Sequence, residues 1–258
     1  MDEVKIYSKA LSVEEIKTEF ERKAEPTVTI QPVTVPVTVP QESSLPAPII
    51  EYTFDNVSIS GLVNASVVDG KKGKGVQIGQ GGYIDTPYKS GLNATYSISA
   101  WIKPGMQTAD VSWFGEVNQT NNTYGIQVLV NPSGVVNFGH YQNISGDWNT
   151  VTTPKAYLEK EGFKHFTFVR KDGDMHQIYV NGEKVAEKIG IPRLANEGSN
   201  TLRIGDDYYY YARNAVGTIF DEIRIYNQAL SEEQVKENYE SYSPAKIVVQ
   251  NTEGIYYM

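Results

Sequence analysis

The residues best suited to binding chemistry lie in one loop near the end of the chain, GDDYYYYARNAVG at 205–217. Tyrosine offers a flat apolar ring and a hydroxyl group, which suit stacking on a sugar or contact with a protein partner. Side chains alternate along a strand, so Tyr208 and Tyr210 would share one face and Tyr209 and Tyr211 the other. One pair could then bind while the other packs, although a tyrosine-rich strand with one buried face is the plainer alternative. The candidate ligand-binding residues are Asp206, Asp207, Tyr208 and Tyr210, with Trp113, Tyr141, Asp147 and Trp148 as weaker candidates on neighbouring loops.

Hydrolytic chemistry has little support in this sequence. A glycosidase needs two carboxyl groups that face each other across a cleft, and no strand-like Glu-x-Asp-x-Glu alternation occurs here. Asp221 and Glu222 are adjacent, so regular strand geometry would point their side chains to opposite faces. The three histidines have neither catalytic nor metal-binding spacing, and we expect them on strand surfaces: His140, His165 and His176. The sequence therefore favours a non-catalytic protein.

The chain contains two copies of one segment. Residues 1–21, MDEVKIYSKALSVEEIKTEFE, align without a gap on residues 220–240, FDEIRIYNQALSEEQVKENYE, with ten of the 21 positions identical. An internal repeat is interpreted before other features of a sequence, because it indicates where the domains begin and end. We expect four parts: the closing strand and helix of a preceding repeat at 1–21, a linker at 22–47, a complete domain at 48–240, and a tail or the start of a next segment at 241–258.

Each copy has the pattern of a strand, a turn and a short helix. Two apolar residues alternate with polar ones, as in a half-buried strand. Ser12 and Ser231 then precede Glu15 and Gln234 by three residues, which is the spacing of a capping box. The second copy therefore predicts a helix at 231–240. The strand at 2–7 could stay untethered, pair within its own domain, or complete a sheet in a neighbouring molecule and so build a head-to-tail filament.

The remainder of the domain reads as antiparallel strands. Runs such as YSISAWI, FKHFTFVR and HQIYVNG recur at short spacing, separated by turn residues. Asn181-Gly182 is a strong two-residue hairpin turn, and Asp172-Gly173 is a second turn signal. The linker RKAEPTVTIQPVTVPVTVPQESSLPA predicts a semi-rigid extended spacer, or alternatively an edge strand. The tail after Tyr239 could be a hairpin or a further linker. We expect an all-β, two-sheet antiparallel jelly-roll sandwich with one short C-terminal helix.

Five segments in order resemble the laminin-G-like, concanavalin A-like lectin/glucanase superfamily as it occurs in repetitive prokaryotic surface proteins. These are IIEYTFDN at 49–56, GKKGKGVQIGQGGYIDTP at 70–87, YSISAWIKP at 96–104, HFTFVRKDGDMHQIYVNGEKV at 165–185 and the closing FDEIRIYNQALSEEQVKENYE. The resemblance covers about 48–240. It implies a lectin-like sandwich that acts in adhesion or ligand binding.

The resemblance also implies a structural calcium ion that ties the opening strand of the domain to its closing strand. Calcium prefers six to eight oxygen ligands from carboxylates, amides and carbonyls. The positions that match are Asp55 and Asp221, with Asn56, Asp69 and the backbone near Gly73 as further candidates. The alternative is that Asp55 and Asp221 only cap turns or pair with Lys72 or Lys74.

Composition narrows the possible partners and location. The net charge is −8, and no basic patch interleaved with aromatics supports nucleic-acid binding. No apolar stretch approaches the roughly 20 residues that cross a bilayer. The absence of cysteine excludes disulfides and thiol chemistry. The N-terminus has no apolar signal core, so we expect a fragment whose targeting signal lies elsewhere. Six sequons favour an exported protein with glycans, although asparagine and threonine are also common in turns: Asn56, Asn64, Asn93, Asn118, Asn121 and Asn143.

The functional expectation is a non-catalytic module of an extracellular, multi-repeat cell-surface protein that binds a carbohydrate or a protein ligand. The alternative is a structural subunit that assembles with copies of itself through its N-terminal strand into a surface filament or layer. A glycan hydrolase is the weakest of the three readings.

Overall fold

A computed structural model describes residues 7–21, 43–55, 60–91, 94–117, 125–141, 148–192, 200–208, 213–242, 248–251 and 254–257. The chain divides into a large unit, Glu42–Lys246, and a small unit formed by Met1–Gln41 and Ile247–Met258. Residues 2–6 of the predicted strand and most of the predicted linker lie outside the described residues.

In its described residues the small unit contains one helix and one pair of strands. Helix α1, Val13–Glu21, begins with the predicted capping box: the Ser12 N–H donates to the Glu15 carboxylate at 2.8 Å, and the Glu15 N–H donates to the Ser12 hydroxyl at 3.2 Å. Strands β14, Val248–Asn251, and β15, Gly254–Tyr257, pair antiparallel. Of the two readings left open for the tail, the hairpin is the one observed.

The large unit is a sheet of thirteen described strands that folds over on itself. The strands are β1 Ile50–Tyr52, β2 Leu62–Asp69, β3 Lys74–Asp85, β4 Tyr96–Lys103, β5 Val111–Gly115, β6 Gln127–Val130, β7 Val136–Tyr141, β8 Trp148–Thr152, β9 Lys164–Lys171, β10 Met175–Val180, β11 Glu183–Ile189, β12 Arg203–Ile204 and β13 Ile219–Tyr226. A 3-10 turn, η1, spans Glu159–Glu161, and helix α2 spans Glu232–Glu240.

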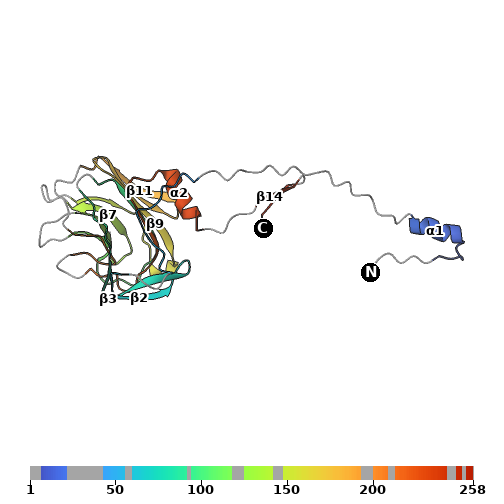
Figure 1. Cartoon of the computed structure of the whole chain (residues 1–258), viewed down its shortest axis with the longest axis horizontal. Helices are drawn as coiled ribbons and strands as arrows, with labels where there is room; N and C mark the ends of the chain where they lie inside the picture. Colours follow the sequence, from blue (N-terminus) through green and yellow to red (C-terminus); the bar gives the residue numbers. More distant parts are fainter. Residues whose placement is uncertain are drawn as a thin grey trace. The chain divides into compact units, whose positions relative to one another are not determined.

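Hydrogen bonding follows the order β11-β10-β9-β4-β13-β3-β12-β5-β6-β7-β8, with β1 on β13 and β2 on β3. The long strand β3 pairs with strands of both layers, and β8 comes against β10 and β11. The result is a nearly closed antiparallel sandwich of two layers with α2 beside it (Figure 1). The predicted jelly-roll sandwich is confirmed.

Alternating apolar residues of both layers meet in the core. Phe168 of β9 lies with its ring centroid 6.0 Å from that of Phe114 of β5 and 5.4 Å from that of Phe138 of β7. Trp113 is fully buried and packs edge-on against Phe166. The expectation of Trp113 as a loop residue available to a ligand is therefore wrong, because it lies within β5 and its large apolar surface is more stable between the layers.

Local turn and cap signals hold as predicted. Asn181 and Gly182 both take positive φ, 53° and 81°, in the two-residue turn between β10 and β11. Ser231 caps α2 through a complete capping box with Gln234. Leu230 and Val235 are buried together on the outer side of the sheet, against Val169 and Tyr179.

All three histidines are buried, which corrects their expected place on strand surfaces. His140 of β7 follows the core residue Phe138 by two positions and so faces the same interior, where its ring stacks on His176 at 4.8 Å and contacts Arg170. His165 packs between Trp101 and Tyr239 beneath α2. Burial lowers the pKa of each imidazole, to about 3 for His165 and for His176. At neutral pH each therefore packs as an uncharged aromatic ring.

Candidate binding site

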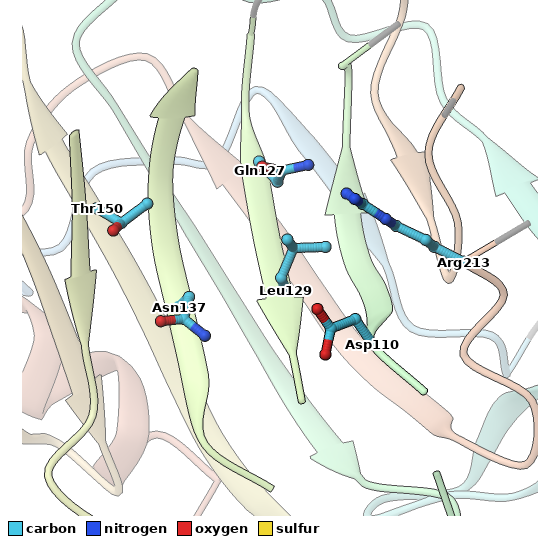
Figure 2. A pocket seen from close by; sticks show the side chains of 6 residues that line it. All are labelled: Asp110, Gln127, Leu129, Asn137, Thr150 and Arg213. Atoms are coloured by element: carbon cyan, nitrogen blue, oxygen red, sulfur yellow. The ribbon is translucent and has the colours of Figure 1, made fainter. Parts of the chain in front are cut away.

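The outer face of β5–β8 carries a polar hollow of about 270 Å³ (Figure 2). Cross-strand register explains why its residues meet: Leu129 stands opposite Asn137, and Gln127 opposite Gly139. Gly139 in turn stands opposite Thr150, with the Asn149 carbonyl so close that no Cβ would fit. The residues that line the hollow are Asp110, Gln127, Leu129, Asn137, Thr150 and Arg213.

Gln127 is the most unusual residue of this hollow. The side chain is only 2% exposed, and neither its amide oxygen nor its amide nitrogen has a hydrogen-bond partner. Buried polar groups are nearly always paired, because leaving one unpaired costs roughly 1–3 kcal/mol. Figure 2 shows Gln127 on β6 with the Arg213 side chain extending from the neighbouring loop on the same side. The hollow thus contains a donor and an acceptor that a ligand could satisfy.

The loop after β12 positions Arg213. Asp206 and Asp207 are both buried, and the Asp207 carboxylate lies 3.6 Å from the Arg213 guanidinium. Burial raises the pKa of Asp206 above its ordinary value. The Arg213 carbonyl accepts a hydrogen bond from the Ser112 N–H at 2.8 Å, which ties the loop to β5. The two aspartates predicted as ligand-binding residues are therefore buried within the loop and are not among the residues that line the hollow.

Tyr208 is half-buried and is not among the residues that line the hollow. Its ring and that of Tyr83 each lie 3.9 Å from the Arg203 guanidinium, and its hydroxyl lies 3.1 Å from the Thr201 hydroxyl. Tyr208 lies in a bend, so the strand-like alternation predicted for the four tyrosines is not tested by the described residues. Tyr210 and Asp147 lie outside the described residues.

Positions 141 and 148 close one end of the same sheet face. They belong to strands β7 and β8 rather than to loops, and they are direct register partners. Each lies two residues along its strand from Gly139 or Thr150, so alternation puts the backbone positions of Tyr141 and Trp148 in phase with the hollow. Their expected role in ligand binding stays a prediction.

Asp55 and Asp221 converge on one turn, Gly70–Lys74, which joins β2 to β3. Asp55 Oδ1 accepts the Lys74 N–H at 2.7 Å, and Asp221 Oδ2 accepts the Lys72 N–H at 2.9 Å. Gly73, at φ 60°, leaves no room for a Cβ beside the Asp55 carboxylate. The opening and closing segments of the domain are thus held together at this turn.

Several acidic groups lie beside this turn. Burial raises the pKa of Asp221 to about 6, and burial also raises the pKa of Glu222, although the nearby Lys72 and Arg224 charges oppose that shift. Glu222 Oε1 is buried without a partner. A bulge in β13 and a left-handed backbone at Glu222, φ 49°, interrupt the regular alternation of this strand, and both acidic side chains are buried.

The other predicted metal ligands are less well placed. The Asp69 carboxylate is exposed and pairs with Lys74 Nζ at 2.7 Å, and Asn56 lies outside the described residues. Within the described ranges, no group of three or more histidine and acidic side chains is arranged to hold a metal ion. A cation here would need carbonyl oxygens of the turn in addition to Asp55 and Asp221, which is the oxygen-rich donor set that calcium accepts.

One predicted glycosylation site is described. Asn64 is exposed in β2, with its amide nitrogen 3.5 Å from the Gly81 carbonyl. The other five sequons lie outside the described residues: Asn56, Asn93, Asn118, Asn121 and Asn143. Their glycosylation stays a prediction. No helix in the described part of the chain has the length and apolar character to cross a membrane.

The sandwich and its polar outer hollow define a lectin-like architecture, and comparison with known families agrees. Residues 78–236, more than half of the chain, match the family described as the concanavalin A-like lectin/glucanases superfamily. The chain belongs to this family.

Several solved structures share the fold at low sequence identity. Domain 4 of AbnA, a GH43 extracellular arabinanase from Geobacillus stearothermophilus solved with arabinotriose, is 21% identical with a TM-score of 0.55, covering 74% of this chain and 97% of that one. The binding domain of Paraclostridial Mosquitocidal Protein 1 is 14% identical with a TM-score of 0.58, covering 72% and 48%. The receptor-binding domain of botulinum neurotoxin C/D mosaic serotype is 14% identical with a TM-score of 0.57, covering 76% and 51%. This chain thus spans about half the length of the two toxin domains.

Proposed function

We propose that this chain is a non-catalytic, carbohydrate-binding module and that the hollow on β5–β8 is its binding site. The observation that carries the proposal is the buried amide of Gln127, which has both a donor and an acceptor unpaired within the hollow. Sugars present adjacent hydroxyl groups that can donate and accept at once. An amide is suited to such a pair because it offers both functions in one plane.

The other lining residues extend this complementarity. Asn137 and Thr150 add an amide and a hydroxyl, Asp110 and Arg213 add one charge of each sign, and Leu129 adds an apolar contact for the C–H face of a sugar ring. This mostly polar lining suits a ligand that is rich in hydroxyl groups, such as a sugar. The solved complex of AbnA domain 4 with arabinotriose makes an oligosaccharide the first ligand class to try.

Binding without hydrolysis is the reading that the lining favours. Of the described residues around the hollow, Asp110 alone carries a carboxyl group, whereas a glycosidase ordinarily uses two across the scissile bond. The histidines, being buried and uncharged, offer no general base at this surface.

The setting that we propose is extracellular, on a repetitive cell-surface protein, with a glycan or a glycosylated surface protein as partner. The exposed sequon at Asn64, the lack of cysteine and the repeated segment support this setting. We also propose a structural calcium ion between Asp55 and Asp221, supported by the convergence of both carboxylates on one turn.

Gln127→Met tests the site directly, because it keeps the length of the side chain and removes both hydrogen-bonding groups. A glycan array that includes arabino-oligosaccharides identifies a ligand, and calorimetry then measures its affinity. We expect binding weaker by about fivefold to thirtyfold, since one or two hydrogen bonds of about 1 kcal/mol each are lost.

Gln77→Met is the matched control. Gln77 lies in β3, outside the hollow, where its amide donates to the Gly217 carbonyl at 3.4 Å. This variant should bind with unchanged affinity. Equal affinities for the Gln127 variant and the parent chain would place the binding site elsewhere.

A further inference from the structure

The two copies of the repeated segment share a local structure but differ in burial. Both helices begin with the same capping box. In the second copy Val235 is 0% exposed and Tyr226 is 0% exposed. The matching residues of the first copy, Ile16 and Tyr7, are 55% and 43% exposed. The first copy therefore presents an apolar face that its counterpart buries completely.

The second copy shows what such a face packs against. Leu230 and Val235 lie on Val169 of β9 and Tyr179 of β10. Polar contacts fix helix α2 and the residues before it to β4. The Leu230 N–H donates to the Ser97 hydroxyl at 2.9 Å, and the Asn238 amide donates to the Ser99 hydroxyl at 2.8 Å. We call this surface, formed by Ser97, Ser99, Val169 and Tyr179, the cradle of the closing helix.

A paired substitution indicates that the first copy suits a similar cradle. In the second copy the Arg224 guanidinium donates to the side-chain amide oxygen of Asn238 at 2.8 Å, which links strand to helix. The aligned residues of the first copy are Lys5 and Glu19. At the positions of this cation and amide the first copy has a cation and a carboxylate, so an attractive contact can form across the same strand–helix junction once the first copy has docked.

We propose that residues 2–21 are a closing segment for a second β-sandwich of this kind, which they enter by placing Leu11 and Ile16 in its cradle. The cradle of this chain is already filled by α2. The partner is therefore a sandwich of the same family whose own closing strand and helix are missing or displaced. Two sandwiches would then be joined through the segment that follows α1.

A graft tests whether the first copy is a competent closing segment. In the full chain, residues 221–240 are replaced by the sequence of residues 2–21, with Phe220 retained because it packs in the core. We expect one cooperative thermal transition, within about 10 °C of the parent. The same graft with serine at the positions derived from Leu11 and Ile16 should lose that transition. A first graft without cooperative unfolding would overturn the proposal.

The paired charges give a readout that general packing would not move. Within the graft, the residue derived from Lys5 is changed to glutamate, the residue derived from Glu19 to lysine, and then both together. Each single change should lower the melting temperature, and the double change should restore most of the loss. Additive losses in the double variant would show that the two residues do not face each other, and would contradict the proposed docking.

Direct binding is measured with a fluorescent peptide of residues 1–21. The acceptor is the full chain with Leu230→Ser and Val235→Ser, which loosen α2, and with Leu11→Ser and Ile16→Ser, which disable its own first copy. We expect saturable binding that is at least tenfold weaker for the Ile16→Ser peptide. No binding to an acceptor that retains its β-sheet circular dichroism would overturn the proposal, and if the acceptor is unfolded the graft decides alone.

Discussion

Replacing His165 with phenylalanine should make the protein about 3 kcal/mol more stable than the parent at pH 4.5, while costing nothing at pH 8. His165 is buried among Trp101, Tyr239 and Tyr242, and neither ring nitrogen has a partner. Burial lowers its pKa from 6.5 to about 3. The unfolded chain therefore takes up a proton near pH 6.5 that the folded chain refuses until about pH 3. The stability that depends on the neutral ring is present above pH 6.5 and is lost as the pH falls towards 3.

Urea unfolding at pH 8 and at pH 4.5 measures this difference. Two pH units below 6.5 correspond to about 2.7 kcal/mol for one such group. Tyr239→Phe is the control, because it alters the same aromatic cluster without a titrating group in this range, so its effect should be equal at the two pH values. If the His165→Phe effect is also independent of pH, the imidazole takes up its proton over the same pH range in the folded and unfolded chains, which would contradict the prediction.

Calcium should raise the melting temperature of the parent chain by roughly 5–10 °C relative to excess chelator. A ligand that binds only the folded state adds about 2.7 kcal/mol when present at 100 times its dissociation constant. For a domain of this size, 1 kcal/mol corresponds to roughly 2–4 °C. The expected source is relief of the charge that Asp55, Asp221 and the buried Glu222 collect beside one turn.

Asp221→Asn should abolish the response to calcium, because it removes the charge that faces the turn. Asp174→Asn is the matched control: Asp174 is an acidic residue in the turn between β9 and β10 that pairs with Lys171 at 2.8 Å. This control should respond to calcium like the parent. Identical melting curves of the parent in calcium and in chelator would refute the proposed ion.

Local sequence signals were sufficient for most of the fold. Alternation in YSISAWI and FKHFTFVR predicted β4 and β9, and Asn181-Gly182 predicted the tightest hairpin. Each of these features depends on residues within a few positions of one another. The capping boxes of α1 and α2 are local for the same reason. The repeat added one long-range prediction, which was the extent of the domain at 48–240.

The site was harder to predict because it depends on register between distant strands. Gln127 and Asn137 stand out in YGIQVLV and VVNFGHY as polar residues in the phase opposite to the apolar core, and that signal could have found them. Nothing local shows that Gly139 lies between Gln127 and Thr150 across the three strands. The bulge at Asp221–Glu222 and the burial of the three histidines also depend on tertiary packing, which overrides the strand pattern.

Nuclear magnetic resonance titration of the isotope-labelled chain with a glycan that it binds tests the central claim most directly. The carbohydrate site proposed on β5–β8 predicts that the largest shift changes fall on the backbone amides of Gln127, Leu129, Asn137, Gly139 and Thr150. Arg213 should shift with them, because its side chain lines the same hollow. Shifts gathered instead around the β10–β11 turn or the loop after β4, or a chain that binds no glycan at all, would contradict the account.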